Sequence, residues 1–430
     1  MTGSKYLKLC TAASIAALSV SLAGCGSTDA NQSGNGESNA AGDVTLEFTQ
    51  WWEPELPDNA LRGLMDEFEE QNPGIKVKLL SGPYASTREQ IVAGAAAGTM
   101  SDVVGLDGAW VNDFAKQGAI ANLSEMMEKK GYDASKLVSQ VKVDDQTYSI
   151  PVTNFVYPLF VNDGLLEKAG IKEAPKTRTD FMKTAQAVSD ENTKGWALPL
   201  SLEAPNGIQN DVMSWVWASG GSMLKDGKPY LEGNKDVEEV VQYIKDLSDQ
   251  DLIAPGALTM KEQDKVEEFT NGRVAMMIDS LAHVNLIREN NPDLKFSLAP
   301  IPAKDGYDGK RGMPFASWGV GISATSKHPD EAWKLVEFLL SKDVNAKLCD
   351  AANAFPGNTD SEPQFVKKDE ILASAFEIWK EGTPANEFTG LPVAEQLMRE
   401  FDESFQKILS EGGDIPSMRK TVQASWTQNF

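Results

Sequence analysis

The stretch that most constrains the fold covers residues 44–79, where two alternating segments flank a helical one. Apolar and polar residues alternate over 44–50 and again over 75–79, which predicts two strands. Between them, apolar residues recur at helical spacing over 61–68, and Asn72-Pro73-Gly74 ends the helix. A strand–helix–strand unit of this length builds parallel sheets, so the chain is predicted to be an α/β protein.

The remainder of the chain continues with both kinds of element. Helices are predicted at 87–97, 163–169, 178–189, 237–247, 264–271 and 330–340, and strands at 103–106, 273–278, 294–301 and 319–323. Strands concentrate in the first and middle parts, helices dominate the C-terminal part, and no fixed-period repeat is visible.

Length and charge limit the organisation and the partners. About 385 of the 430 residues follow position 43, which is more than one hydrophobic core usually organises, so two domains are expected. The net charge of -23 gives a surface that repels nucleic acid and anionic lipid. We therefore expect no nucleic-acid partner, and a soluble monomer outside the cell.

The first residues have the pattern of an export signal. Lys5 and Lys8 precede an apolar, Ala-rich stretch that is too short to span a membrane, and Leu22-Ala-Gly-Cys25 follows. This ending resembles the bacterial lipoprotein signal, in which the cysteine receives a diacylglycerol and becomes the new N-terminus. Residues 1–24 are thus predicted to be a lipoprotein signal peptide, Cys25 the lipidation site and 25–43 a flexible tether. The alternative is an ordinary cleaved signal with an incidental cysteine.

Cysteine and histidine usage excludes some chemistry. If Cys10 leaves with the signal and Cys25 is lipidated, Cys349 is alone and no intrachain disulfide forms. The two histidines, His283 and His328, are far apart in sequence and lack metal-ligand spacing. No metal and no cofactor are therefore predicted.

Five segments of the chain form a recognisable series. In chain order they are LRGLMDEFEEQNPGIKVK (61–78), AAGTMSDVVGL (96–106), FTNGRVAMMID (269–279), LAPIP (298–302) and GISATSKHPDEAWKLVEFLL (321–340). These segments resemble the extracellular solute-binding proteins of carbohydrate ABC transporters, a group similar in layout to maltose-binding protein. The resemblance implies a two-lobed, periplasmic-binding-protein-like fold, with a hinge and a ligand cleft between the lobes. It also implies an oligosaccharide ligand and the permease subunits of an ABC importer as partners.

The resemblance also suggests where the chain passes between the lobes. Crossings are expected near 151–155, 279–282 and 323–327. These positions assign 44–152 and 280–325 to the first lobe, and 153–279 and 326–430 to the second.

Candidate ligand-binding residues follow from the position of ligands beyond the carboxyl ends of parallel strands. A sugar ring packs its C–H face on an aromatic ring and bonds its hydroxyls to carboxylates and amides. The candidates in the first part of the chain are Trp51, Trp52, Glu53, Asp107, Trp110 and Asn154. By resemblance, the second lobe adds Glu203 and the aromatic platform Trp215, with Trp217 packed behind it. Asp279, Phe315 and Trp318 lie near the later crossings, whereas Trp333 and Trp379, within helices, are expected to pack in the interior.

Some residues depart from the family's pattern. Relatives commonly place an aromatic residue three positions after the residue equivalent to Asp279, and this chain has Ala282 there. No aromatic residue around 391–400 matches the C-terminal one used in maltose-binding protein. These differences disfavour a maltodextrin-specific site and leave the glycan open.

Two other classes of function remain to be weighed. A glycoside hydrolase needs two facing carboxylates, but a chain with 63 acidic residues can always supply a pair. Serine hydrolase, zinc protease and P-loop signatures are absent, so no catalytic residue is assigned. A peptide or polyamine binder of the same fold is the other alternative, and Arg88, Arg273 or Arg311 could hold a peptide carboxylate. Binding of an uncharged sugar without catalysis is the preferred interpretation.

Overall fold

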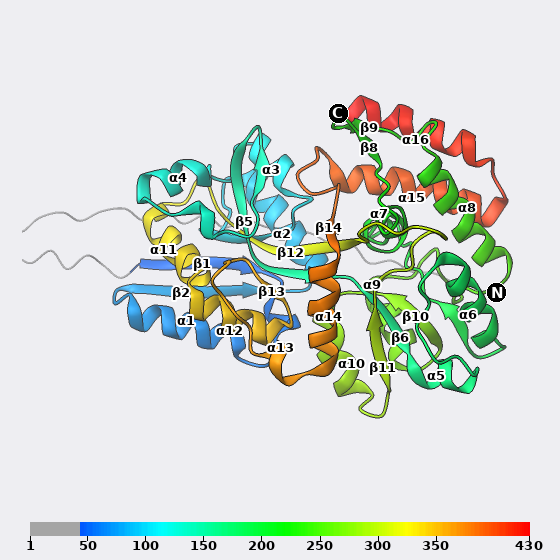
Figure 1. Cartoon of the computed structure of the whole chain (residues 1–430). Helices are drawn as coiled ribbons and strands as arrows, with labels where there is room; N and C mark the ends of the chain where they lie inside the picture. The colour runs from blue at the N-terminus through cyan, green and yellow to red at the C-terminus, as the bar shows by residue number, and fades with distance from the viewer. Residues whose placement is uncertain (1–43) are drawn as a thin grey trace, which may run out of the picture. The chain divides into compact units, whose positions relative to one another are not determined.

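The computed structural model describes residues 44–430, and these form an α/β structure with two main sheets (Figure 1). The predicted signal peptide, Cys25 and the predicted tether lie outside the described residues. No helix within 44–430 combines the length and the apolar character needed to cross a membrane.

The first sheet has eight strands and is built around β1. Its order is β13 (Phe355–Pro356), β5 (Gln146–Val156), β12 (Gly312–Ile322), β3 (Val103–Leu106), β1 (Val44–Gln50) and β2 (Ile75–Ser81), with β4 (Val141–Val143) beside β5 and β14 (Thr383–Ala385) beside β12. Strand β1 is parallel to both neighbours, and Phe48 lies opposite Val103 of β3. Strand β12 runs antiparallel to β3 and β5. The predicted strand–helix–strand unit is therefore present at residues 44–81.

Helices cover the first sheet. They are α1 (Ala60–Gln71), α2 (Tyr84–Ala97), α3 (Val111–Lys116), α4 (Leu123–Lys130), α11 (Pro329–Leu339) and α12 (Lys342–Ala352), with the short turn η2 (Ala134–Lys136). Helix α1 buries the apolar residues at helical spacing, among them Leu61 and Phe68, and it packs against α12. In Figure 1 the blue helix α1 and the orange-yellow helix α12 lie side by side. Trp333 of α11 is fully buried and meets Tyr132 edge to face, as the sequence predicted.

The second sheet has four strands, in the order β11 (Phe296–Ala299), β6 (Leu159–Asn162), β10 (Val274–Ile278) and β7 (Lys194–Trp196). Its apolar strands are nearly continuous; every residue of β6 and β10 is buried, as expected where both faces are covered. The associated helices are α5 (Asp163–Lys168), α6 (Arg178–Val188), α9 (Glu262–Thr270), α10 (Val284–Asn290), α13 (Phe365–Lys368) and α14 (Glu370–Glu381).

The remaining elements of the half that contains the second sheet are mostly helices. These are the π-helical turn η3 (Ile208–Val212), α7 (Met213–Trp217), the hairpin β8 (Leu224–Lys225) and β9 (Lys228–Pro229), α8 (Lys235–Asp249), α15 (Ala394–Glu411) and α16 (Ile415–Asn429). Helix α8 packs against α7, α15 and α16. In Figure 1 the red and orange helices α16 and α15 lie beside the green α8.

The passages between the two sheets differ in part from the expected ones. The first follows β5 at Tyr157-Pro158, close to the expected position. Strand β11 pairs with β6, so residues 296–299 belong to the second sheet, although 280–325 was assigned to the first lobe. Conversely, α11 and α12 pack on β12 and β5, although 326–430 was assigned to the second lobe. The reason is that sheet membership depends on the strand partner: β11 pairs with β6 and buries Phe296 and Leu298 in the core of the second sheet.

Candidate functional site

Three aromatic rings meet where β1 and β3 end. Because these two strands are parallel neighbours, their carboxyl ends lie at the same edge of the sheet and bring Trp51 beside Trp110. The ring centroids of Trp51 and Trp110 are 5.3 Å apart, and Tyr84 at the start of α2 lies 5.3 Å from Trp51 and 4.9 Å from Trp110. Both tryptophans are nearly buried, whereas Tyr84 is half-buried. Trp51, Tyr84 and Trp110 are called the aromatic cluster below.

A second pair of rings lies beneath this edge. Trp52 stacks on Trp318 of β12 with centroids 5.3 Å apart and planes inclined by 7°, and Phe155 of β5 packs at 4.8 Å from Trp318. Trp52 is 0% exposed and Trp318 is 3% exposed. These two rings cover each other, so in this structure they support the edge and offer no open face to a ligand. Their role as sugar platforms stays a prediction that requires the pair to separate.

Asp107 follows β3 directly and is held by its neighbours. One carboxylate oxygen accepts the backbone N–H of Ala109 at 2.8 Å, and the other accepts the hydroxyl of Tyr84 at 3.2 Å. Burial raises the pKa of the Asp107 carboxyl, and these two hydrogen bonds oppose the rise. The predicted residues Asp107 and Trp110 are thus brought together with Trp51, and Tyr84 joins them.

An ion pair borders the aromatic cluster. Arg88 of α2 lies 2.6 Å from Glu395 of α15, and its guanidinium is 6.0 Å from the ring centroid of Trp110. This pair connects a helix on the first sheet with a helix packed on α8. Because Arg88 already has a carboxylate partner, it is not a free cation for a peptide ligand.

A buried charged network lies in the second half of the molecule, around Lys265 of α9. Lys265 is 0% exposed, its Nζ lies 3.3 Å from carboxylate oxygens of Asp211 and Asp279, and it donates to the carbonyl of Ile278 at 2.5 Å. Asp279 also lies 2.8 Å from Nδ1 of His283. Asp279, a predicted site residue, is therefore committed to two cations.

The network fixes the charges of its members. Burial raises the pKa of Asp211 to about 8, and the Lys265 charge only partly opposes this. Burial disfavours the imidazolium of His283, but the Asp279 carboxylate outweighs it and raises the pKa of His283 to about 9. Burial acts against the charged form of Asp279 too, yet His283 and Lys265 hold its pKa below the ordinary value. At neutral pH the network thus holds Lys265, His283 and Asp279 charged and Asp211 mostly protonated.

Carboxylates from both halves interact electrostatically with this network. Glu55 of the turn η1 (Glu53–Glu55) comes from the first half, and Glu262 of α9 from the second. Glu55 keeps surface exposure, yet the protein that surrounds it raises the pKa of its carboxyl to about 7, with His283 opposing and Glu262 adding to the rise. Atoms of Glu262, Asp279 and His283 able to bind a cation lie within 4.8 Å of one another.

Tyr157 lies at the passage from β5 to β6. It is 7% exposed, and its backbone N–H is held by the carbonyl of Pro314 at 3.1 Å. Burial raises the pKa of its hydroxyl well above the ordinary value, and four carboxylates add to this: Glu262, Asp279, Glu55 and Asp107. Glu55, Tyr157, Glu262, Asp279 and His283 are called the inter-lobe cluster. Sequence reasoning missed all of these except Asp279; the Tyr-Pro step at a predicted crossing was the available signal.

The remaining predicted residues of the first half are placed around these groups. Glu53 accepts the hydroxyl of Ser81, and its backbone N–H donates to Gln50 at 2.9 Å. Asn154 is buried and donates to the carbonyl of Pro356 at 3.0 Å, while its Oδ1 has no partner in residues 44–430. Phe315 packs 6.3 Å from Trp379, which stacks on Phe355, so Phe315 lies beside α14 and not in the aromatic cluster.

In the second half, the structure corrects the expectation for Trp215. Its ring is fully buried in the interior, 4.9 Å from Phe181 and 5.7 Å from Trp196, so it is not an accessible platform. Trp217, expected behind it, points elsewhere, because residues two apart on a helix face different ways. Its Nε1 donates to Glu387 at 2.6 Å. Glu203 is exposed and forms an ion pair with Lys261, beside the start of α9.

A segment near the C-terminus reaches the edge where β3 ends, which sequence reasoning also missed. The backbone N–H of Gly390 donates to the carbonyl of Gly108 at 3.1 Å, and Asn112 donates to the carbonyl of Gly390 at 3.1 Å. A side chain at Gly108 would meet Thr389 at 2.8 Å. The segment thus needs glycine at 108 in order to approach Asp107 and the aromatic cluster.

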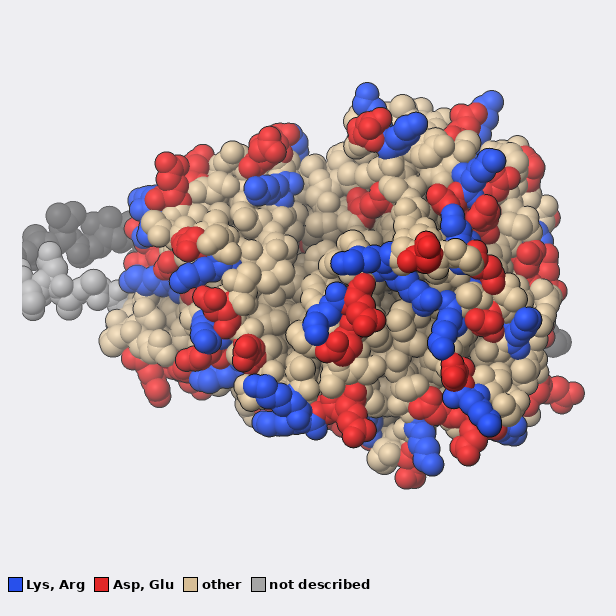
Figure 2. All heavy atoms as spheres, in the orientation of Figure 1, with Lys and Arg blue, Asp and Glu red and all other residues tan. Residues whose placement is uncertain are grey.

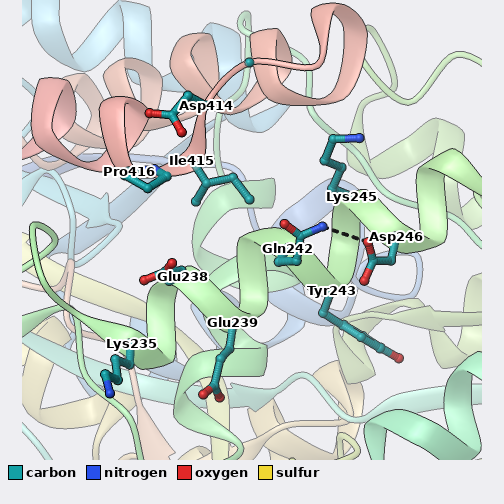
Figure 3. Close-up of a pocket in the computed structure, with 11 residues that line it drawn as sticks. Lys235, Glu238, Glu239, Gln242, Tyr243, Lys245, Asp246, Asp414, Ile415 and Pro416 are labelled. Carbon is teal, nitrogen blue, oxygen red and sulfur yellow. Dashed lines mark hydrogen bonds between the residues drawn. The ribbon is translucent and has the colours of Figure 1, made fainter.

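The described residues also line surface pockets made of other side chains. One of about 680 Å³ lies between α8 and the start of α16, and Figure 3 shows its charged lining. Gln242 donates to Asp246 at 2.7 Å there, and the hydroxyl of Tyr243 donates to the carbonyl of Arg178 at 2.9 Å. No pair of accessible aromatic rings faces this pocket, so it does not have the composition predicted for a sugar site. Acidic and basic side chains are interspersed over the face seen in Figure 2.

The family follows from the sequence match. Residues 53–346 match the family described as bacterial extracellular solute-binding protein. The chain belongs to this family. A binding protein of Brucella abortus (strain 2308) is 30% identical to this solute-binding protein over 298 residues, covering 68% of this chain and 71% of the relative. The multiple sugar-binding protein of Streptococcus mutans is 24% identical over 366 residues, covering 80% and 81%.

Solved structures show the same fold. A solute-binding protein of an ABC transporter from Thermotoga lettingae, bound with α-D-tagatose, has a TM-score of 0.76 at 22% identity, covering 90% of this chain and 99% of that one. The maltose-bound MalE3 protein of T. maritima has a TM-score of 0.74 at 21% identity, covering 90% and 100%. This solute-binding protein is therefore a two-lobed α/β protein, and the two sheets are the centres of its lobes.

Proposed function

We propose that this solute-binding protein captures an oligosaccharide between its lobes and delivers it to an ABC importer. The observation that carries the proposal is the meeting of Trp51, Tyr84 and Trp110 with Asp107 at the carboxyl ends of β1 and β3. Several relatives and structural neighbours are described as sugar-binding proteins, which supports a sugar as the ligand.

The side chains supply the two kinds of contact that a sugar requires. Tyr84, which is half-buried, offers aromatic surface for the C–H face of a pyranose ring and is backed by the nearly buried ring of Trp110, and Asp107 and Glu262 offer acceptors for hydroxyls. Because the two acidic residues belong to different lobes, a sugar that bonds to both stabilises the closed arrangement over the open one. Closure then marks the loaded state for the permease.

We also propose that the protein binds without catalysis. Its relatives are binding proteins, and Asp279, the most buried carboxylate of the inter-lobe cluster, is already neutralised by Lys265 and His283. Long incubation of the pure protein with a bound sugar, followed by chromatography, should yield no cleavage products. Any turnover would favour the hydrolase alternative.

Export and anchoring complete the proposal. The Leu-Ala-Gly-Cys25 motif supports a lipid anchor that holds the protein at the extracellular face of the membrane, as its extracellular family would require. The exposed large apolar residues of the described part belong to separate elements, which supports a monomer. Cys25→Ala should move the protein from the membrane to the soluble fraction, whereas unchanged membrane association would contradict the anchor.

The binding proposal is tested by titration calorimetry of residues 44–430 against a panel of neutral and amino-substituted oligosaccharides. We expect micromolar or tighter binding of at least one sugar, together with a rise in melting temperature. Binding of a polyamine or a peptide, with no binding of any sugar, would replace the proposal.

A further inference from the structure

One segment near the C-terminus is bonded to both lobes. Residues 387–395 leave β14, which pairs with β12 of the first sheet, and run into the first turn of α15 in the second lobe. In Figure 1 the orange chain between β14 and α15 loops toward α3 before α15 begins. The contacts of this segment therefore depend on how the two lobes sit against each other.

The start of the segment is anchored on the second lobe. The Glu387 carboxylate accepts the indole N–H of Trp217 at 2.6 Å and the backbone N–H of Met223 at 2.8 Å. Phe388 is 0% exposed and packs against Trp426 of α16, with ring centroids 5.8 Å apart. These contacts are made within the second lobe, so they should persist when the lobes move apart.

The middle of the segment is bonded to the first lobe. The backbone N–H of Gly390 donates to the carbonyl of Gly108 at 3.1 Å, and its carbonyl accepts from Nδ2 of Asn112 at 3.1 Å. The backbone N–H of Val393 donates to Oδ1 of Asp113 at 3.1 Å. The three partners follow β3 directly or lie in α3. A rotation that opens the lobes would break these hydrogen bonds.

An ion pair adds to these links at the end of the segment. Glu395 lies 2.6 Å from Arg88 of α2, and Arg399, one turn further along α15, lies 3.3 Å from Glu395. The Arg88 and Glu395 side chains are 34% and 24% exposed, so solvent screens the pair only in part. Like the hydrogen bonds, this ion pair joins groups of the protein itself and spans the two lobes.

Val393 has a strained backbone where it meets the first lobe. Its φ of 44° and ψ of 36° lie in the left-handed region, which β-branched residues rarely adopt. Val393 is also the cap residue of α15, a position that ordinarily has an extended backbone. Strain of this kind persists only where neighbouring contacts hold it, and Asp113 of the first lobe supplies such a contact. Opening of the lobes would release it.

We infer that residues 387–395 form a latch, whose bonds to α2, α3 and the end of β3 stabilise the closed arrangement of the lobes, while the strain at Val393 favours opening. This inference rests on the proposed function and adds to it a control of sugar release by groups that need not touch the sugar. The apparent Kd equals the intrinsic Kd divided by the closed fraction. A change in the latch should therefore change the Kd of every sugar by the same factor.

Two variants weaken the latch and leave the aromatic cluster unaltered. Asn112→Ala removes the hydrogen bond to Gly390, and Glu395→Gln removes the ion pair with Arg88. Each should raise the Kd about two- to tenfold, which is the net effect of one such bond, and chiefly through faster dissociation. Titration calorimetry and stopped-flow tryptophan fluorescence of residues 44–430, with two chemically different sugars that bind, measure both quantities.

A third variant should act in the opposite direction. Val393→Asn keeps the backbone N–H that bonds to Asp113, and asparagine adopts the left-handed conformation more readily than a β-branched residue. The closed state then loses its strain, so the Kd should fall about threefold or more and dissociation should slow. Damage to the fold would not produce tighter binding.

Matched controls remove similar groups within one lobe. Asn72→Ala deletes a hydrogen bond of the same kind, from Nδ2 to the carbonyl of Phe68 at 2.9 Å at the end of α1. Glu403→Gln neutralises an exposed carboxylate two turns beyond Glu395 on α15. Both should leave the Kd and the dissociation rate within about twofold of the wild type, although Asn72→Ala is expected to lower the melting temperature.

The lobe arrangement is also measured without sugar. Small-angle X-ray scattering of residues 44–430 gives the radius of gyration, which increases when the lobes separate. Relative to the wild type, the radius should be larger for Asn112→Ala combined with Glu395→Gln and smaller or equal for Val393→Asn. This measurement needs no ligand, so it tests the latch even if the proposed function is wrong.

Each outcome decides between the proposals. An unchanged Kd, dissociation rate and radius of gyration in the two weakening variants would overturn the latch and leave the proposed function intact. A loss of affinity that differs more than about threefold between the two sugars would assign these residues to direct sugar contact and overturn the latch. Weaker binding by Val393→Asn would overturn the role of strain. If no sugar bound, the proposed function would fail, and an unchanged radius in the combined variant would overturn the latch as well.

Discussion

Replacement of Lys265 by methionine tests the buried network on which the inter-lobe cluster rests. Methionine keeps the length of the side chain and removes the charge. Lys265 is fully buried, lies 3.3 Å from both Asp211 and Asp279, and donates to the carbonyl of Ile278, so the variant loses an ion pair and a hydrogen bond together.

The size of the effect depends on which carboxylates are ionised. Removing one partner of a buried ion pair costs about 3–5 kcal/mol, because the other charge is left uncompensated. At pH 7 Asp211 is mostly protonated, since its pKa is about 8, and Asp279 retains His283; the loss should therefore lie near the lower value. At pH 9.5 the wild type has Asp211 ionised and paired with Lys265, and His283, with a pKa of about 9, is mostly neutral. The variant then loses the ion pairs of both carboxylates, so the loss should approach the upper value.

Urea unfolding of residues 44–430 at both pH values measures this difference. The midpoint should fall while the slope stays the same, because the surface exposed on unfolding does not change. Lys265→Met combined with Asp211→Asn should recover part of the loss at pH 9.5, since it removes one of the two orphaned charges. The control is Lys176→Met, whose exposed pair with Glu173 should contribute less than about 1 kcal/mol. A loss below about 1 kcal/mol for Lys265→Met at both pH values would refute the pairing.

Three further predictions follow from the same structure. The pKa of His283 is raised from 6.5 to about 9 in the folded state, so its contribution to stability is fully present below pH 6.5 and is lost as the pH rises through 9. Its size is up to roughly 3 kcal/mol at 1.36 kcal/mol per pKa unit, and His283→Asn should flatten this part of the stability–pH curve. Trp110→Ala should lower sugar affinity by about 2 kcal/mol, or roughly thirtyfold in calorimetry, because its ring belongs to the aromatic cluster; an unchanged affinity would remove it from the site. Trp333→Ala should lower stability by about 3–5 kcal/mol and leave the affinity of the folded fraction unchanged, since its ring is fully buried in the first lobe; a large affinity loss would contradict this.

The sequence predicted those parts of the fold that depend on local pattern. The strand–helix–strand unit at 44–81 has the expected elements, and β10 and α11 lie close to their predicted positions. The assignment of 280–325 to the first lobe was wrong for β11, because an apolar strand can pair with either sheet and the pattern does not name its partner. Because the chain passes between the two lobes more than once, the lobe boundaries depend on such long-range strand pairing.

In the candidate site, too, the residues placed by local pattern could be predicted, and those placed by long-range contacts could not. Trp51, Asp107 and Trp110 could be predicted to meet because strand ends in a parallel sheet share an edge. The different orientations of Trp215 and Trp217 could not be predicted. Apolar residues surround both tryptophans in the short helix α7, so the pattern does not single out one face. Glu55 and Glu262 are two acids among many, and the sequence does not indicate that both raise the pKa of Tyr157. Lys265 did carry a signal, since it lies four residues before the buried Phe269 on the apolar face of α9.

The most direct test of the account is a crystal structure of residues 44–430 with the tightest-binding sugar of the panel. The account predicts a sugar between the lobes, packed against Tyr84 or Trp110 and hydrogen-bonded to Asp107 and Glu262, with Tyr157 beneath it. A sugar bound elsewhere, for example in the pocket between α8 and α16 shown in Figure 3, with no contact to these residues, would contradict it.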